Sequence, residues 1–160
     1  MRVCYFGTYD ADYVRNRVII AGLRAQGVQV VECHVALWRE TADKVRQASR
    51  GLLNPRLAWR FLRAYIELWR LYRQIGDYDV MVVGYAGHID VFPARILTWL
   101  ARKPLALDLF LSLHETVTQD RGLVAEQSFF GKMLYVIEKV GCRLADRLFL
   151  DTEADIQYLM

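Results

Sequence analysis

Five short aliphatic runs, each followed by a polar cluster and a helical pattern, constrain the fold of this chain more than any other feature. Strands that alternate with helices pack parallel, and parallel strands bring their carboxyl ends to one edge of the sheet, where ligands bind. The pattern predicts an α/β fold, a Rossmann-like doubly wound parallel sheet with helices on both faces and one site at that edge. The runs are residues 2–6, 28–33, 79–83, 104–109 and 147–150.

Helical patterns fill the intervals between these runs. Gly27 follows the first interval as a C-terminal stop. Pro55 begins the longest one, at a first-turn position where its missing N–H costs nothing. The stretch 111–126 is expected to be a long loop, which in compact domains is more often functional than not. The helices are predicted at residues 12–26, 55–76, 91–101 and 128–145, with a shorter one near 42–48.

Length and composition bound the class of protein. The 160 residues fit one domain with a sizeable core, and the sequence lacks the apolar run of about 18 residues that a transmembrane span requires. The N-terminus has neither the apolar region nor the cleavage site of a signal peptide. Three widely spaced cysteines without a Cys-x-x-Cys pair predict buried free thiols in a reducing compartment, the cytoplasm.

The net charge of +3 is unevenly distributed along the chain. Residues 36–76 contain nine basic and three acidic residues, so this segment carries +6 and the remainder −3. Because the whole domain is near neutral and has no recognised nucleic-acid motif, a nucleic-acid partner is disfavoured.

The first polar cluster, Gly7-Thr8-Tyr9-Asp10, lies at the expected turn between a strand and a helix. Backbone N–H groups at the start of the next helix could meet an anion there, or Asp10 could simply cap the helix. A single glycine disfavours the usual dinucleotide-binding fingerprint.

The cluster after the third run combines two glycines with a histidine. Gly84 and Gly87 permit close backbone approach or positive φ, His88 could donate to a sugar hydroxyl or phosphate, and Asp90 could orient it. Alternatively, Asp90 caps the next helix and His88 is merely exposed. We favour binding because the glycines and the histidine coincide at the binding edge. His34, after the second run, is interpreted as structural.

The expected loop after the fourth run carries Ser112, His114, Glu115, Asp120 and Arg121. A Ser/His/Asp triad could be assembled from them, but no Gly-x-Ser-x-Gly elbow is present, so a hydrolase is disfavoured. The spacing of acidic residues and histidine does not match a metal site either. Hydrogen bonding to a hydroxylated ligand is the expectation.

The helix predicted at 55–76 has a narrow polar stripe and an apolar arc wider than packing on one sheet requires. Basic residues beside tryptophan and tyrosine suit an anionic membrane surface, where tryptophan lies at headgroup level and arginine snorkels. The alternative is a core helix whose second flank meets a partner domain. The surface candidates are Trp59, Arg60, Arg63, Trp69 and Arg70.

Four segments together resemble the N-terminal half of a family 4 glycosyltransferase of the retaining GT-B class. They are residues 1–7, 16–24, 78–88 and 103–108, and residues 151–154 are similar to the start of the helix after that half's fifth strand. The resemblance implies two Rossmann-like domains across a cleft, with the acceptor on the N-terminal one and the sugar nucleotide on the other. It also implies that no metal or cofactor is required and that attachment to the cytoplasmic membrane face is common.

The resemblance places the Gly7 turn near acceptor and donor phosphate, although Thr8 replaces a second glycine often found there. It places His88 near the transferred sugar, and Ser112 and His114 in a loop where relatives also carry a histidine, with offset spacing. The family's basic phosphate ligands and paired glutamates belong to the C-terminal domain, so this chain is expected to bind without catalysing alone. The expected binding residues are Gly7, Thr8, Tyr9, Asp10, Gly87, His88, Asp90, Ser112, His114, Arg121 and Glu153.

A capping box at Thr152 and Asp155 announces a further helix, in which the sequence stops. We therefore expect residues 1–160 to be an N-terminal domain whose partner, the C-terminal nucleotide-sugar domain, is missing. The expected activity is transfer of a sugar from a nucleotide-diphosphate sugar to a lipid-linked or saccharide acceptor, in the cytoplasm or peripherally at the membrane. The alternative is a stand-alone flavodoxin-like or receiver-like binding module, although the acidic pair and the hydroxyl-rich phosphate loop of those classes are missing.

Overall fold

The structure, a computed structural model, describes residues 1–37, 55–110, 112–120, 122, 125 and 127–151. Within them, strands and helices alternate along the chain. The elements are β1 (Arg2–Gly7), α1 (Val14–Ala25), β2 (Gln29–His34), α3 (Pro55–Ile75), β3 (Val80–Val83), α4 (Val91–Ala101), β4 (Leu105–Phe110), α5 (Leu113–Glu115), the π-helical turn η1 (Thr116–Asp120), α6 (Phe129–Leu144) and β5 (Arg147–Leu150).

The strands form one five-stranded sheet in the order β2-β1-β3-β4-β5, and every neighbouring pair is parallel. The chain moves from β1 to β2 on one side and then crosses back to β3 on the other side of β1. The direction of winding therefore reverses between β1 and β3, the position at which open parallel sheets bind ligands. The predicted doubly wound, Rossmann-like α/β fold is confirmed.

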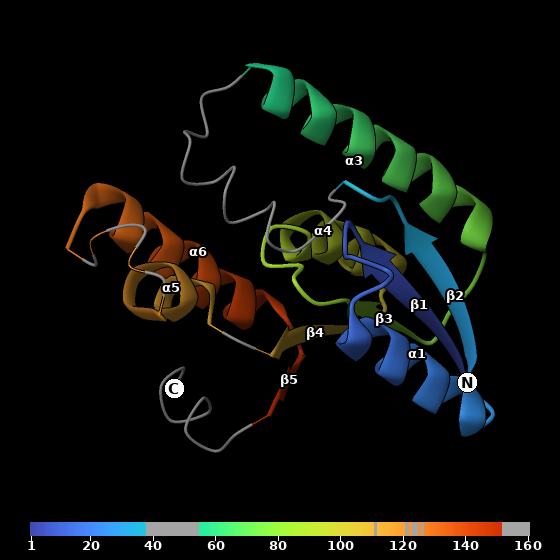
Figure 1. Cartoon of the computed structure of the whole chain (residues 1–160). Helices are drawn as coiled ribbons and strands as arrows, with labels where there is room; N and C mark the ends of the chain where they lie inside the picture. Colours follow the sequence, from blue (N-terminus) through green and yellow to red (C-terminus); the bar gives the residue numbers. More distant parts are fainter. Residues whose placement is uncertain (38–54, 111, 121, 123–124, 126, 152–160) are drawn as a thin grey trace.

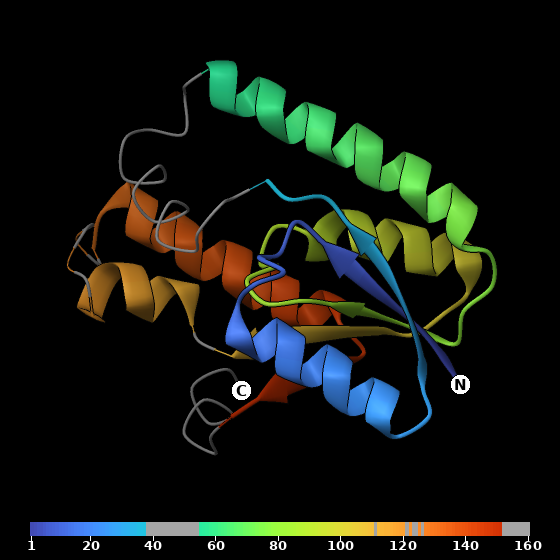
Figure 2. The same cartoon turned by 45° about the vertical axis from the view of Figure 1, so that its right-hand side comes forward.

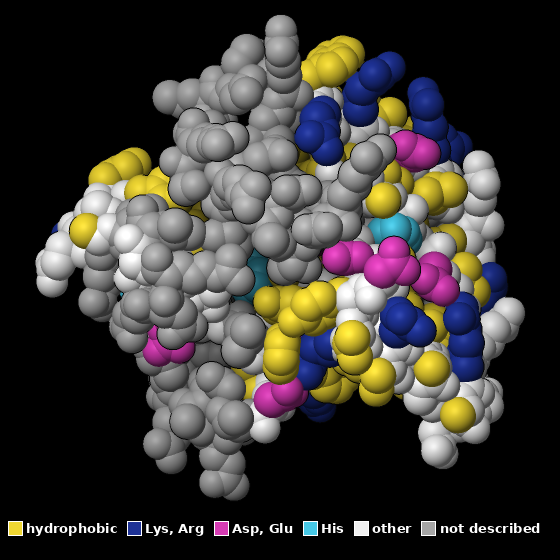
Figure 3. Space-filling view, viewed as in Figure 1, with side chains coloured by type: hydrophobic (Ala, Val, Ile, Leu, Met, Phe, Trp, Pro, Cys, Tyr) yellow, Lys and Arg dark blue, Asp and Glu magenta, His cyan; other side chains and the backbone are white. Residues whose placement is uncertain are grey.

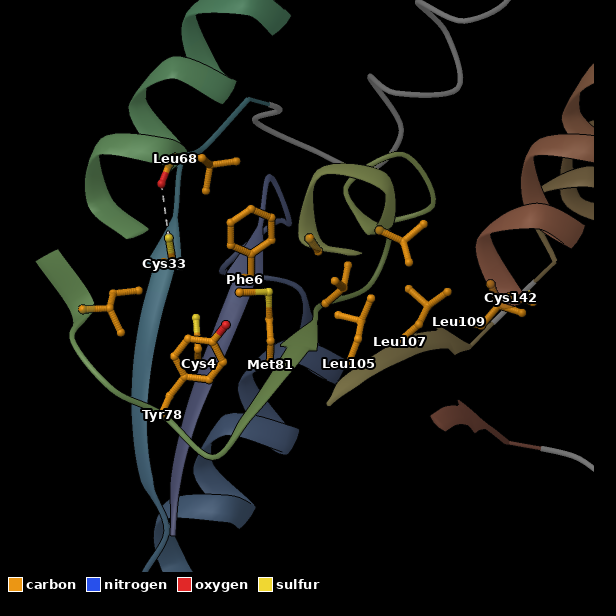
Figure 4. Packing of buried hydrophobic residues seen from close by; sticks show 14 residues of the cluster. Cys4, Phe6, Cys33, Leu68, Tyr78, Met81, Leu105, Leu107, Leu109 and Cys142 are labelled. Carbon is orange, nitrogen blue, oxygen red and sulfur yellow. Dashed lines mark hydrogen bonds between the residues drawn. The ribbon is translucent and has the colours of Figure 1, made fainter. Parts of the chain in front are cut away.

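Helices cover both faces of the sheet, with α3, α4 and α6 on one face and α1 on the other (Figure 1, Figure 2). Alternate strand residues face the two helical layers. Phe6 and Met81 pack with Leu68 of α3 (Figure 4), whereas Tyr5 packs with Ile20 of α1. The central strands are therefore apolar on both sides, as a parallel sheet between two layers requires.

The predicted strands and long helices end within two residues of the observed ends, which is the usual spread of element boundaries. The prediction of a long loop at 111–126 is wrong in part, because this stretch contains α5 and η1. The Ser112 hydroxyl caps α5 by accepting a hydrogen bond from the Glu115 backbone N–H (3.1 Å). The shorter helix near 42–48 and the capping box at 152–155 lie outside the described residues.

Cys4, Cys33 and Cys142 are buried free thiols, as expected. Burial raises the pKa of the Cys142 thiol to about 11, so this side chain is protonated and unreactive near neutral pH. In the described part of the chain, no helix is both long and apolar enough to cross a membrane.

Candidate functional site

The loops after β1 and β3 meet at the carboxyl edge of the sheet, where the direction of winding reverses. The Asp90 carboxylate, 2% exposed, accepts hydrogen bonds from the backbone N–H (2.7 Å) and the hydroxyl (3.0 Å) of Thr8. The Tyr65 hydroxyl of α3 donates to the same carboxylate (2.8 Å). Burial and then the Asp90 charge raise the pKa of Tyr65, so its hydroxyl stays protonated as a donor. One buried carboxylate thus joins two of the predicted segments.

Gly7 makes this contact possible. Its φ of 138° lies in a region that L side chains rarely adopt, and a Cβ at this position would lie 2.7 Å from Asp90 Oδ2. Asp90 itself stands at the N-cap position of α4 but makes no side-chain capping bond, so the alternative in which its side chain caps this helix is wrong. Because Asp90 accepts the Thr8 N–H, the protein's own carboxylate uses one backbone donor of the turn at which the sequence left an external anion open.

Gly84 and Gly87 bring the β3 loop against the sheet. A Cβ on Gly84 would lie 2.5 Å from Tyr5 Cε1, and one on Gly87 would lie 2.3 Å from Val83 Cγ1. Neither glycine has a positive φ, so both serve close packing of the protein's own atoms. His88 is 5% exposed, and the alternative in which it is merely exposed is therefore wrong.

Asn16, in the first turn of α1, connects the same two loops and was missed at the level of sequence. Its Nδ2 donates to the carbonyl oxygens of Asp10 (2.9 Å) and Tyr85 (2.7 Å). Its Oδ1 accepts from the Tyr5 hydroxyl (2.9 Å), and the residue is fully buried. A signal was present, because Asn16 falls one helical turn before buried Ile20 on the same face.

Glu138 of α6 holds the segment after β4 and was also missed. It is buried, and its carboxylate accepts from the Ser112 hydroxyl (2.8 Å), the Leu113 N–H and the His114 N–H (3.2 Å). Burial raises the pKa of Glu138, while the bonds from Ser112 and the two backbone N–H groups oppose the rise. Ser112 and His114 are themselves buried, so the structure places both predicted residues in an internal network.

A second network lies between α1, β4 and the end of β5. The Arg15 guanidinium donates to both oxygens of Asp108 from Nε (2.8 and 2.9 Å) and reaches Asp151 Oδ1 with Nη1 (2.6 Å). Burial raises the pKa of Asp108, with the Arg15 hydrogen bond and charge opposing it. The Arg15 guanidinium also lies 4.3 Å from the centre of the Phe110 ring. None of these residues was predicted, since Arg15 and Asp108 are 93 positions apart.

Tyr9, which follows β1, packs on His34, the last residue of β2. Tyr9 is fully buried, and its hydroxyl donates to Glu32 Oε2 (3.0 Å). The ring of His34 lies 4.3 Å from the Tyr9 ring, and its Nε2 is 2.7 Å from the Tyr9 carbonyl oxygen. The contacts of His34 are those of a structural residue, as interpreted from the sequence.

The remaining members of the predicted set are partly accessible or lie outside the described residues. Asp10 is half-buried and accepts from the Asp12 N–H (3.0 Å). It does not cap α1, whose N-cap residue is Tyr13. Arg121 and Glu153 lie outside the part of the chain that the structure describes.

The outer side of α3 carries apolar and basic side chains together (Figure 3). Trp59 is 58% exposed and Trp69 is 50% exposed. On the opposite side, Leu68 is buried against the sheet and Ala64 against Leu37. Arg63 lies over the Trp59 ring at 5.9 Å and Arg73 over the Trp69 ring at 4.9 Å. We call this the α3 outer face; it comprises Trp59, Leu62, Arg63, Ile66, Trp69, Arg70 and Arg73. Arg60, predicted on the same surface, instead donates from Nη2 to the Leu37 carbonyl oxygen (2.8 Å).

Across the described ranges, no group of three or more His, Cys, Asp and Glu side chains is arranged to hold a metal ion. The carboxyl edge thus combines buried carboxylates that tie loops together with half-buried aromatic and acidic side chains. Its chemistry is hydrogen bonding and ring packing.

Comparison with known proteins returns no match, either to a family model or to a curated sequence.

Proposed function

We propose that this chain is the acceptor-binding N-terminal half of a retaining, metal-independent glycosyltransferase with two Rossmann-like domains. The observation that carries the proposal is the joining of the β1 and β3 loops by Asp90 at the point where the winding reverses. The segments that resemble the family form β1, α1, β3 with its loop, and β4. These are the elements that build the carboxyl edge.

In the proposed enzyme this edge is one wall of a cleft, and a second domain forms the other. The chain binds and orients the acceptor hydroxyl. The second domain supplies the sugar nucleotide and the cationic groups that stabilise the departing diphosphate. The rate enhancement then rests on positioning and on electrostatic stabilisation of the leaving group, with no metal and no cofactor.

The test is sugar transfer by the protein produced from the complete open reading frame. The donors are radiolabelled UDP-glucose, GDP-mannose and ADP-glucose, the acceptors are maltotriose and a membrane lipid extract, and EDTA is present throughout. We expect label in one acceptor, with the anomeric configuration of the donor retained. Absence of transfer with every pair, or a reading frame that ends at Met160, would contradict the proposal.

One observation favours a second candidate, a stand-alone flavodoxin-like binding module. The strand order β2-β1-β3-β4-β5 is the order of that class. Against it, the Thr8 N–H is already used by Asp90, and the hydroxyl-rich phosphate loop is missing. Titration with flavin mononucleotide separates the two, because quenching of flavin fluorescence is expected only for the flavodoxin-like module.

We further propose that the α3 outer face lies on an anionic membrane surface, peripherally and on the cytoplasmic side. Tryptophan at headgroup level with arginine beside it is the composition of interfacial helices. The four exposed apolar side chains on this face, Trp59, Leu62, Ile66 and Trp69, are each at least 43% exposed. An acceptor linked to a lipid would then be presented to the edge from the membrane.

A further inference from the structure

Three aromatic rings lie in a row at the carboxyl edge, each from a different element. Tyr13 precedes α1, Tyr85 follows β3 and Phe110 ends β4. The Tyr13 and Tyr85 rings are 5.1 Å apart, and Tyr85 meets Phe110 in an edge-on contact at 5.1 Å. Tyr85, the middle ring, is buried, whereas Tyr13 and Phe110 are half-buried and reach the surface. We call these three rings the aromatic platform.

Acidic residues are connected to two members of the aromatic platform. Asp12 is exposed and precedes Tyr13, and the Asp10 carbonyl accepts the Tyr13 N–H (3.2 Å). Asp151 binds Arg15, whose guanidinium lies over Phe110. Figure 3 shows hydrophobic side chains near the centre of this face with acidic side chains above and below them.

Among the residues that the structure describes, the charged groups at this edge disfavour a phosphate group. A phosphate is bound by backbone N–H groups and by arginine or lysine. The Arg15 guanidinium is already held by Asp108 and Asp151, and the Thr8 N–H is held by Asp90. The exposed Asp12 carboxylate, next to Tyr13 in the chain, would repel an anion. A neutral ligand rich in hydroxyl groups meets no such repulsion and can donate to this carboxylate.

We infer that the aromatic platform binds a neutral hexopyranose ring. The apolar C–H face of the sugar packs on Tyr13 and on the part of Phe110 that Arg15 leaves accessible, and Asp10 and Asp12 accept hydrogen bonds from its hydroxyls. The inference deepens the proposed function, on which it rests for the role of this sugar as acceptor. It assigns the substrate class of this wall as a neutral saccharide, with the phosphate groups of the reaction elsewhere.

The test is a titration of the chain, labelled with 15N, with the methyl α-pyranosides of glucose, mannose and galactose and, separately, with inorganic phosphate. We expect amide shifts at Asp12, Tyr13 and Tyr85 with at least one sugar and none with phosphate. Tyr13→Ala should raise the dissociation constant about tenfold, because a stacked ring is lost. Tyr13→Phe, which keeps the ring, should leave it nearly unchanged.

Two further variants control for folding and position. Asp12→Asn is at an exposed position and should weaken sugar binding while leaving the amide spectrum otherwise intact. Tyr135→Ala removes a tyrosine that is 37% exposed on α6 and should leave the dissociation constant unchanged.

Absence of sugar-induced shifts, shifts caused by phosphate, or full affinity in Tyr13→Ala would each overturn the inference. The outcome is separable from that of the proposed function. Sugar binding on the platform without any sugar transfer by the complete protein would retain the platform and reject the transferase. Sugar transfer that does not depend on Tyr13 would retain the transferase and reject the platform as the sugar site.

Discussion

At the scale of single residues, three buried polar side chains hold the carboxyl edge in place. Asp90 joins the β1 and β3 loops, Asn16 joins both loops to α1, and Glu138 joins the segment after β4 to α6. Each leaves buried donors unpaired when it is removed, at a cost of about 1–3 kcal/mol per group. The geometry of the edge therefore depends on residues that need not touch a ligand.

Gly7→Ala should destabilise the protein. The backbone at φ 138° costs a residue with a side chain about 1–3 kcal/mol, and the new Cβ would displace the Asp90 carboxylate. Gly22→Ala is the matched control, since no atom lies within 4 Å of its Cβ and alanine in a helix gains about 0.5–1 kcal/mol. Urea denaturation measures both, and equal stability of Gly7→Ala and wild type would contradict the structure of the loop.

At the scale of elements, the outer face of α3 carries two exposed tryptophans, each with an arginine over its ring. Replacement of both Trp59 and Trp69 by serine should abolish co-sedimentation with vesicles that contain phosphatidylglycerol. Arg63→Glu with Arg70→Glu should do the same, because about 1 kcal/mol of attraction per basic residue is lost and repulsion is added.

Control variants for α3 come from α1, on the opposite face of the sheet. Val18 is 62% exposed there and Arg17 is also exposed. Val18→Ser and Arg17→Glu should leave vesicle binding unchanged. Wild-type protein that stays in the supernatant, or equal losses in both sets of variants, would reject the membrane role.

The stability of the protein should depend on pH through Glu138, which holds the segment after β4 against α6. Because burial raises its pKa above the ordinary 4.5, the folded state holds the proton more tightly than the unfolded chain. The stability that this adds is fully present below pH 4.5 and is lost as the pH rises through the raised pKa.

Glu138→Gln removes this titration while keeping the size of the side chain. The free energy of unfolding of wild type minus that of the variant should therefore fall as the pH rises from 4 to about 7. Urea denaturation across this range measures the difference. A difference in free energy of unfolding that stays constant or rises with pH would contradict a raised pKa of Glu138.

Elements were predictable from the sequence because their periodicity is local, as the five parallel strands and the matching ends of α4 show. The hydrogen-bond partners at the carboxyl edge were not predictable, because they lie far apart in the sequence. Thr8 and Asp90 are 82 residues apart, and Ser112 and Glu138 are 26 apart. Polar residues on the buried face of a helix were the available signal for Asn16 and Glu138. The glycines were located correctly, but they accommodate the protein's own side chains.

At the scale of the whole molecule, the two edges of the sheet differ in chemistry. The carboxyl edge gathers the aromatic platform and the acidic side chains. The amino edge has an open groove of about 660 Å³, lined in part by Arg95, Trp99, Lys103 and Asp146. The central claim is that the carboxyl edge is the ligand-binding wall, and the amino-edge groove is the clearest competing location.

Hydrogen–deuterium exchange of the protein from the complete reading frame, with and without the methyl hexopyranosides and UDP-glucose, distinguishes these locations most directly. We predict slower exchange on ligand addition in residues 7–13 and 84–90, with no change in residues 95–105. Slower exchange confined to residues 95–105 would place the ligand at the amino edge and contradict the claim.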